Sequence, residues 1–167
     1  MTFRRTIFSA FFFAATSQAA EPSWEQLQCI PTWAKPALER EAFSAKYVLS
    51  NRINPFILQG DFNGDGRTDL AVLVAERNSG RSGVAILHAA ADEPLVVGAG
   101  TSLGAGGTDF AWLNAWSVYP KGLVEKGADP NPPPKLHGDA LFVQHLEAAS
   151  AIIYWDASAY RWYQQGD

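Results

Sequence analysis

Oxygen-bearing side chains recur at alternate positions in one short segment of the chain. Asp61, Asn63 and Asp65 are each separated by one residue, and Asp69 is the ninth position counted from Asp61. Ca²⁺ takes six to eight oxygen ligands from carboxylates, amides and backbone carbonyls. A tightly wound loop with this spacing directs the first three side chains at one centre, and the Arg67 carbonyl and the Asp69 carboxylate complete the shell. The segment therefore predicts a calcium-binding loop.

The residues around these donors distinguish between kinds of loop. Gly66 occupies the sharpest turn, where the backbone takes φ > 0 at little cost to glycine. An EF-hand needs an acid at the twelfth position, which is Val72 here, and the residues after Leu70 are typical of a strand. The alternative is an Asn-Gly-Asp-Gly hairpin turn whose acids face water, although such a turn needs no carboxylate at both the first and ninth positions.

The segment resembles the calcium loops of FG-GAP and VCBS-type repeats, in which D-x-[DN]-x-D-G-x-x-D-L joins two antiparallel strands of a propeller blade. Residues 61–70 match every defined position. The resemblance implies one structural Ca²⁺. Its ligands would be the side chains of Asp61, Asn63, Asp65 and Asp69 and the backbone carbonyl of Arg67. A closed propeller needs four to eight blades, and the sequence shows one clear copy of the loop, so we expect a single repeat.

Two weaker similarities accompany this one. The whole chain resembles small secreted bacterial proteins that carry one such loop and end in Trp-Tyr-Gln-Gln-Gly-Asp, here Trp162 to Asp167. That resemblance implies no activity. Gly107–Phe110 and Gly138–Leu141 are faint echoes of the loop without its acid spacing.

The first residues are typical of a secretory signal peptide. Arg4 and Arg5 form a positive n-region, an apolar run follows, and Ser17 and Ala19 suit cleavage after Ala19. The run is shorter than the ~20 residues that a spanning helix needs. We therefore expect a signal peptide over residues 1–19 and a periplasmic or extracellular protein that does not span the membrane after cleavage. The export route, Sec or twin-arginine, stays open.

The charge argues against a nucleic-acid partner. The net charge of −4 becomes −6 without Arg4 and Arg5, because 11 basic residues then face 17 acidic ones. Nucleic-acid affinity rests on Lys and Arg that neutralise phosphates, and no basic run follows the leader. The single cysteine, Cys29, has no intramolecular disulfide partner, and we expect it to be buried and unreactive.

Hydrophobic patterning predicts an N-terminal helical segment over residues 20–55 and an antiparallel β domain over residues 56–167. After Pro36, four apolar residues recur at helical spacing and predict a helix of about three turns; they are Leu38, Ala42, Ala45 and Leu49. From Phe56 onward, apolar runs alternate with turn residues. The predicted fold class is mainly β: an antiparallel meander or sandwich-like sheet with a short N-terminal helical segment, and not a closed propeller.

One motif suggests an enzyme. Residues 100–104 fit the G-x-S-x-G pattern around Ser102, and His137 and His145 follow downstream. That pattern requires a helix after the serine, whereas residues 105–109 start a helix poorly. His88 and the other two histidines show no metal-ligand spacing. Because the serine pattern is present, a small secreted hydrolase that uses Ser102 is the alternative function.

The aromatic residues suggest binding. Trp112 and Trp116 are four residues apart, so on one strand they would share a face, and more rings crowd the last hairpin around Trp155 and Trp162. Exposed rings suit a sugar or a partner protein, but large rings also build cores, and we expect most to be core. We expect an exported, non-enzymatic, Ca²⁺-binding β module with a structural or binding role in the cell envelope. The sequence leaves its partner, protein or glycan, open.

Overall fold

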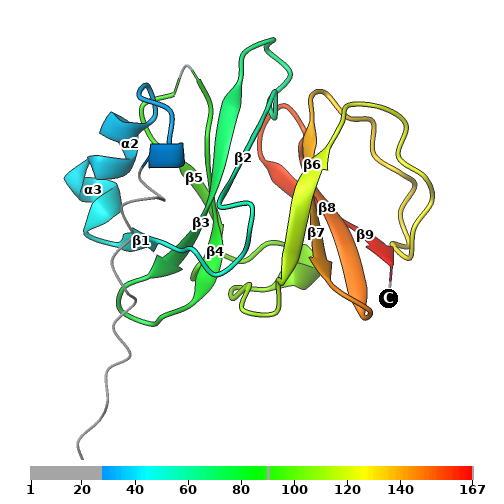
Figure 1. The fold of residues 1–167 in the computed structure, drawn as a ribbon. Coiled ribbons are helices and arrows are strands. Elements are labelled where there is room, and N and C mark those ends of the chain that lie inside the picture. The colour runs from blue at the N-terminus through cyan, green and yellow to red at the C-terminus, as the bar shows by residue number, and fades with distance from the viewer. Residues whose placement is uncertain (1–27, 90, 167) are drawn as a thin grey trace, which may run out of the picture.

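The computed structural model describes residues 28–89 and 91–166. Two antiparallel sheets form the centre of this part of the chain, and short helices lie near its N-terminal end (Figure 1). The predicted fold class is confirmed: the protein is mainly β and antiparallel, with few helices and no closed barrel in the described residues. The predicted signal peptide over residues 1–19 and the start of the helical segment lie outside the described residues.

The first sheet is organised around its central strand. It contains β1 (Tyr47–Leu49), β2 (Ile57–Gly60), β3 (Asp69–Glu76), β4 (Ser82–Leu87) and β5 (Leu95–Gly98). β4 pairs along one side of β3, whereas β2 and β1 pair with successive parts of the other side. Residues 69–74 are all buried, because elements cover both faces of β3. A strand covered on both faces is apolar without alternation.

The second sheet is a meander that packs on the first. It contains β6 (Ala115–Tyr119), β7 (Ala140–His145), β8 (Ala149–Trp155) and β9 (Tyr160–Gly166), in that spatial order. Ala71 and Leu73 of β3 belong to the same buried cluster as Leu141 and Val143 of β7. This cluster lies between the sheets, which form adjacent layers in Figure 1. The two sheets therefore pack face to face as a sandwich around this cluster.

The helices cover the outer face of the first sheet, and they differ from the prediction. α2 (Lys35–Glu39) and α3 (Glu41–Ser44) are separate, because Arg40 has an extended ψ of 134°. Ala42 and Ala45 are exposed, Phe43 is buried instead, and Leu49 lies in β1. The predicted three-turn helix is therefore wrong. The break turns Phe43 toward the sheet, and this burial overrides the weak helical preference of the segment.

A crossover segment (residues 99–114) joins the two sheets. Arg52 holds it in place: its guanidinium donates to the Phe110 carbonyl at 2.7 Å and also to the Leu113 carbonyl. Burial lowers the pKa of Arg52. The four-residue spacing suggested that Trp112 and Trp116 share one face of a strand. Trp112 instead lies in a turn before β6, and only Trp116 belongs to that strand. The carbonyls of Phe110 and Leu113 bond to Arg52, and residues 110–113 form no strand.

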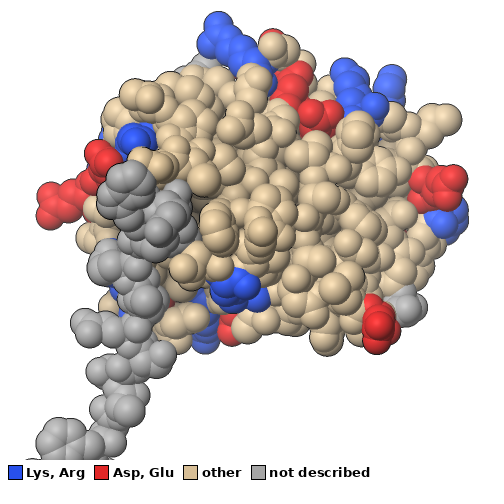
Figure 2. Space-filling view, in the orientation of Figure 1, with Lys and Arg blue, Asp and Glu red and all other residues tan. Residues whose placement is uncertain are grey.

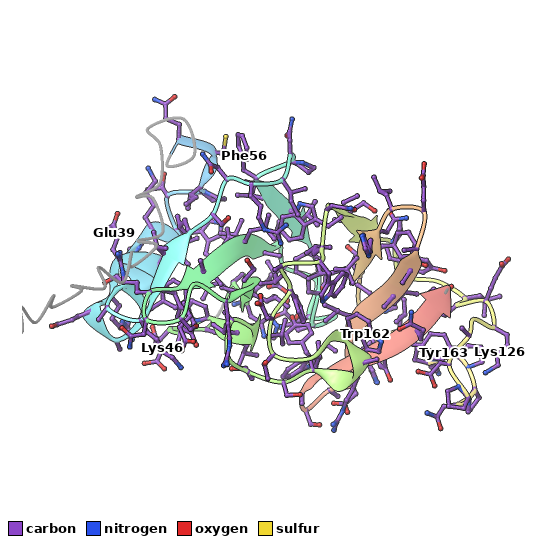
Figure 3. All side chains as sticks on the ribbon, turned by 90° about the horizontal axis from the view of Figure 1, so that it is seen from below. Glu39, Lys46, Phe56, Lys126, Trp162 and Tyr163 are labelled. Atoms are coloured by element: carbon purple, nitrogen blue, oxygen red, sulfur yellow. The ribbon has the colours of Figure 1, made fainter. Side chains whose placement is uncertain are left out.

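An outer loop (residues 120–139) covers the remaining face of the second sheet. Val124 and Leu136 pack there with Ile152 and Tyr163. Figure 3 shows Tyr163 and Lys126 near each other on this side of the molecule. Each face of both sheets is thus covered, which gives this chain three apolar clusters in its described part.

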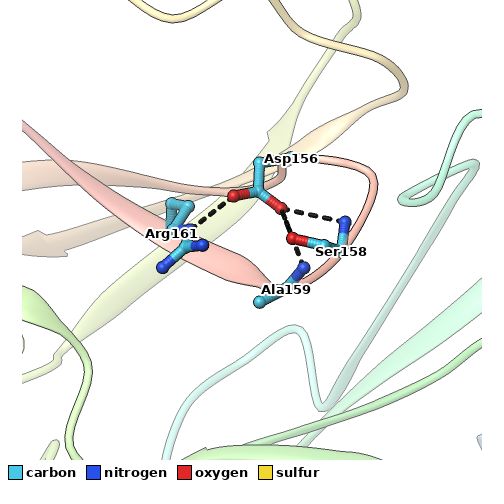
Figure 4. A network of polar contacts seen from close by, with 4 residues as sticks. All are labelled: Asp156, Ser158, Ala159 and Arg161. Atoms are coloured by element: carbon cyan, nitrogen blue, oxygen red, sulfur yellow. Dashed lines mark hydrogen bonds and ion pairs between the residues drawn. The ribbon is translucent and has the colours of Figure 1, made fainter.

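The β8–β9 turn depends on Asp156. One carboxylate oxygen accepts hydrogen bonds from the Ser158 hydroxyl at 2.7 Å and from the Ala159 N–H at 2.8 Å, and the other pairs with Arg161 (Figure 4). These donors, the Ser158 hydroxyl and Arg161 first, lower the pKa of Asp156 well below its usual range. The ionised carboxylate therefore stabilises the turn.

Replacing Asp156 by Asn should change the acid limb of the stability curve. Because its pKa is lower in the folded than in the unfolded state, Asp156 stabilises the fold above its unfolded pKa of 3.8, and this contribution falls as pH drops below that value. We expect wild-type protein to lose more stability than Asp156→Asn between about pH 4 and about pH 2. Urea unfolding over this range measures the difference; parallel curves would contradict the prediction.

Gly83 should not tolerate a side chain. A Cβ there would lie 2.4 Å from the Val97 carbonyl oxygen and 2.6 Å from the Ala99 nitrogen, both of which are backbone atoms. We expect Gly83→Ala to lower the free energy of unfolding by about 1–3 kcal/mol, measured by urea denaturation. Gly122→Ala is the matched control, because the nearest atom to its Cβ would be 3.7 Å away. Equal losses in both variants would contradict this account.

Candidate functional site: the β2–β3 loop

The predicted calcium loop connects β2 to β3 at one end of the sandwich. The hairpin pairs Gly60 with Asp69, so residues 61–68 form the connection. Gly64 and Gly66 have φ of 82° and 84°, a left-handed conformation that glycine adopts readily. The predicted hairpin context and the sharp turn at Gly66 are therefore present.

Side chains of the loop accept hydrogen bonds from its own backbone. Asp61 accepts from the N–H of Gly64 at 2.7 Å and of Gly66 at 2.9 Å, so the chain wraps around this carboxylate. Asn63 accepts from the Asp65 N–H at 3.0 Å, and Asp65 accepts from the Arg67 N–H at 2.8 Å. The Arg67 N–H, followed by the Asn63 amide, holds the pKa of Asp65 below its ordinary value.

Asp69 is fully buried, unlike the exposed Asp65. Its Oδ2 accepts from the N–H groups of Phe62 at 2.9 Å and Asn63 at 3.2 Å, and its Oδ1 accepts from the Ala89 N–H at 2.8 Å. Burial raises the pKa of the Asp69 carboxyl, and these N–H donors oppose the rise. Asp69 therefore joins the start of the loop to the end of β4.

A histidine and two aromatic rings lie next to this carboxylate. His88 precedes Ala89, and its Nε2 shares a 2.7 Å hydrogen bond with the Tyr160 hydroxyl. The Trp155 ring meets His88 edge-on, with centroids 5.1 Å apart. Burial, followed by the charge of Asp69, raises the pKa of Tyr160. Nothing in the local sequence around His88 indicates this partner, which lies 72 positions further along the chain.

Asp139 attaches the loop to the second sheet. Its N–H donates to the Asp61 carbonyl at 2.7 Å, and its carboxylate accepts from the N–H groups of Asp61 at 3.1 Å and Lys121 at 2.9 Å. Contact is close: a Cβ on Gly138 would lie 2.1 Å from the Asp61 carbonyl oxygen, and one on Gly64 would lie 2.4 Å from the His137 carbonyl oxygen. Residues 138–141, which resemble the loop weakly in sequence, thus contact the loop in the structure. Their Gly-Asp pair was the only feature of the sequence that could have indicated this contact.

These contacts test whether the five predicted donors fit Ca²⁺. Asn63, Asp65 and Arg67 lie on the partly or fully exposed side of the loop, and the Arg67 carbonyl accepts no hydrogen bond from the described residues. The carboxylates of Asp61 and Asp69 are turned toward backbone N–H groups. Within residues 28–89 and 91–166, no three His, Cys, Asp or Glu side chains gather closely enough to hold a metal ion. The chemical types of these donors and their sequence along the loop suit a cation. Calcium binding stays a prediction.

Other residues named from the sequence lie apart from this loop. Ser102 is exposed in the crossover segment, and its hydroxyl makes no hydrogen bond to a described residue. A three-residue 3-10 turn, η1 (Gly104–Gly106), follows it in place of the helix that the hydrolase pattern requires. Cys29 is exposed, so the prediction that it is buried was wrong. Trp116 is buried, whereas Trp112, Trp155 and Trp162 are partly buried against the core between the sheets.

Comparisons with protein-family models, with curated proteins and with solved structures found no match to this chain. The resemblance of residues 61–70 to FG-GAP and VCBS-type loops therefore stays a prediction. We infer the function from the chain's own residues.

Replacing Asp69 by Ala should destabilise the protein even in calcium-free buffer. The change leaves three N–H groups at a buried position without their acceptor, and each such group costs about 1–3 kcal/mol. We expect a loss of at least about 2 kcal/mol in the free energy of unfolding, measured by urea denaturation in EDTA. Asp65→Ala, at an exposed position of the same loop, should cost less than about 1 kcal/mol. A larger loss in Asp65→Ala than in Asp69→Ala would contradict the structural role of Asp69.

Proposed function

We propose that the protein is an exported, non-enzymatic β module whose β2–β3 loop binds a structural Ca²⁺. The observation that supports this most directly is the position of the loop at the joint between the two sheets. Asp61 is bonded to Asp139 ahead of β7, and Asp69 is bonded to Ala89 after β4. A cation at this loop would stabilise contacts that connect β3, β4 and the second sheet.

The donor types suit that ion. The side chains of Asp61, Asn63, Asp65 and Asp69 and the carbonyl of Arg67 are the residues that would hold it. When bound, Ca²⁺ supplies positive charge and no chemical reaction. That charge would offset the repulsion between neighbouring carboxylates and would favour the ionised form of Asp69, whose pKa burial raises. In Figure 2, acidic and basic side chains lie close together at the top of the molecule, where Figure 1 places the loop.

The alternative, a hydrolase that uses Ser102, has less support. A serine nucleophile needs a base within hydrogen-bond reach and a third group that orients the base. Ser102 has no hydrogen-bond partner among the described residues, and the histidine with a side-chain partner, His88, is bonded to Tyr160. A binding or structural role is therefore the better proposal.

A role in the cell envelope or outside the cell follows from the leader-like residues 1–19 and is part of the same proposal. In the described part of the chain, no helix has the length and hydrophobicity required to cross a bilayer. On the face drawn in Figure 2, the basic side chains are scattered around the margin and do not gather into one patch. We propose a protein or glycan partner in preference to nucleic acid.

Calcium should raise the melting temperature. A ligand present at 100 times its Kd stabilises the folded state by about 2.7 kcal/mol, which corresponds to about 5–10 °C for a domain of this size. We expect Asp65→Ala to abolish the shift, because it removes a proposed ligand from an exposed position. Differential scanning fluorimetry in EDTA and in millimolar CaCl₂ measures it.

The matched control is Asp92→Ala. Asp92 is an exposed acid outside the loop that forms an ion pair with Arg40 at 3.8 Å, so this variant should keep the full calcium effect. Identical melting of the wild-type protein with and without calcium would sink the structural-ion proposal. So would an equal calcium shift in Asp65→Ala.

A further inference from the structure

A cavity of about 210 Å³ lies beside the second sheet, away from the β2–β3 loop. Its walls come from η1 and the crossover segment on one side and from the strands β7, β8 and β9 on the other. The lining side chains that matter here are Trp112, His145, Ser150, Trp162 and Gln164. Figure 3 views the molecule from below and labels Trp162 beside β9. His145 and Ser150 flank the β7–β8 turn, at the opposite end of β8 from the β8–β9 turn.

Two indole rings form perpendicular walls. The Trp112 and Trp162 rings meet edge-to-face, with centroids 5.8 Å apart and planes at 84°. Both ring nitrogens are already bonded, Trp112 Nε1 to the Gly106 carbonyl at 3.2 Å and Trp162 Nε1 to the Gln164 Oε1 at 3.0 Å. The ring surface that remains is therefore carbon, whose electron-rich face attracts polarised C–H groups.

The glycines of the crossover segment hold one ring rigidly. A Cβ on Gly104 would lie 2.5 Å from the Trp162 Cβ, and one on Gly106 would lie 2.6 Å from the Trp162 ring. The backbone thus lies flat on the indole, and Phe110 packs against both tryptophans with centroid distances of 5.4 and 6.3 Å. A ring fixed in this way loses little conformational entropy when a ligand binds.

The polar side chains at the cavity are hydrogen-bonding groups other than carboxylates, ammonium groups and guanidinium groups. The side chains of His145 and Ser150 make no hydrogen bond to a described residue, and no Asp, Glu, Lys or Arg lines the cavity. Apolar ring faces combined with a few polar groups are typical of small-molecule sites. The matching ligand is neutral, has one face of C–H groups, and carries hydroxyls at its edge. A pyranose sugar has this chemistry.

We propose that this cavity binds a neutral carbohydrate, with one pyranose ring against Trp112 and Trp162. The volume is below the roughly 300–1,000 Å³ of pockets for drug-sized ligands, which suits a single ring. A second space of about 220 Å³ adjoins it and shares His145, Ala149 and Ser150, so it extends the site to a second ring. Glu147 lines that second space, and its carboxylate would accept hydrogen bonds from sugar hydroxyls there. The inference rests on the proposed function only in treating the protein as a binding module, and it does not require the ion.

Titration with defined disaccharides tests the proposal. Cellobiose, maltose, lactose, mannobiose and chitobiose are added to the purified protein, up to about 10 mM, while tryptophan fluorescence and heat are recorded. We expect at least one to bind with a Kd of about 1 mM or lower. Ala105→Trp, at an exposed position on the cavity wall, should raise that Kd at least about tenfold by filling the space. Ala128→Trp, exposed in the outer loop, should leave it unchanged.

Two further variants test the site without adding a large side chain. His145→Ala and Ser150→Ala each remove one hydrogen-bonding side chain, and each should weaken binding several-fold, whereas Ser117→Ala, exposed on β6, should not. No binding of any of the five disaccharides would overturn the proposal, and so would unaltered binding in Ala105→Trp. Binding of a partner protein at this surface, without binding of any sugar, would also overturn the proposal.

Binding in EDTA separates this proposal from the calcium site. Sugar binding that persists in EDTA and in Asp65→Ala supports the cavity whatever the ion does. A calcium-dependent melting shift without sugar binding would overturn the carbohydrate site and leave the structural ion intact.

Discussion

A buried carboxylate must be surrounded by hydrogen-bond donors, and this requirement organises the joint between the two sheets. Asp69 begins the central strand and accepts three backbone N–H groups, two from the start of the loop and one from beyond β4. Leaving such a charge without donors would cost several kcal/mol. The loop therefore folds back over Asp69, and this brings Asp61 to Asp139 ahead of the second sheet. The N–H groups that bond to Asp69 thus determine the course of the loop, of the residues after β4 and of the residues before β7.

The two ends of the sandwich have different chemistry. At the β2–β3 loop, carboxylates and amides face backbone N–H groups, and the donors suit a hard cation that would reinforce the joint. At the β7–β8 turn, two indole rings and the polar side chains of His145, Ser150 and Gln164 line a small cavity. This difference underlies the proposed binding module, in which a bound ion would stabilise the joint at one end and the rings at the other end would contact a ligand.

Glycines decide how closely segments approach at both ends. At the loop, Gly138 and Gly64 allow backbone-to-backbone contact with Asp61 and His137, and at the cavity Gly104 and Gly106 lie directly on Trp162. In each place a side chain would occupy space already filled by another segment. The glycine-rich crossover segment, which resembles a nucleophile motif in sequence, therefore has a packing role in the structure. Ser102 lies within it as an exposed residue without a hydrogen-bond partner in the described chain.

Local patterns in the sequence were sufficient for the mainly β, antiparallel class and for the hairpin that contains Asp61 and Asp69, because spacing and turn residues act over a few positions. They were insufficient for the helix that breaks at Arg40, for the exposure of Cys29 and for Trp112, which lies outside β6. They also could not pair Asp61 with Asp139 or His88 with Tyr160. Those features depend on which surface lies opposite each segment, and only the packing of one sheet on the other determines that.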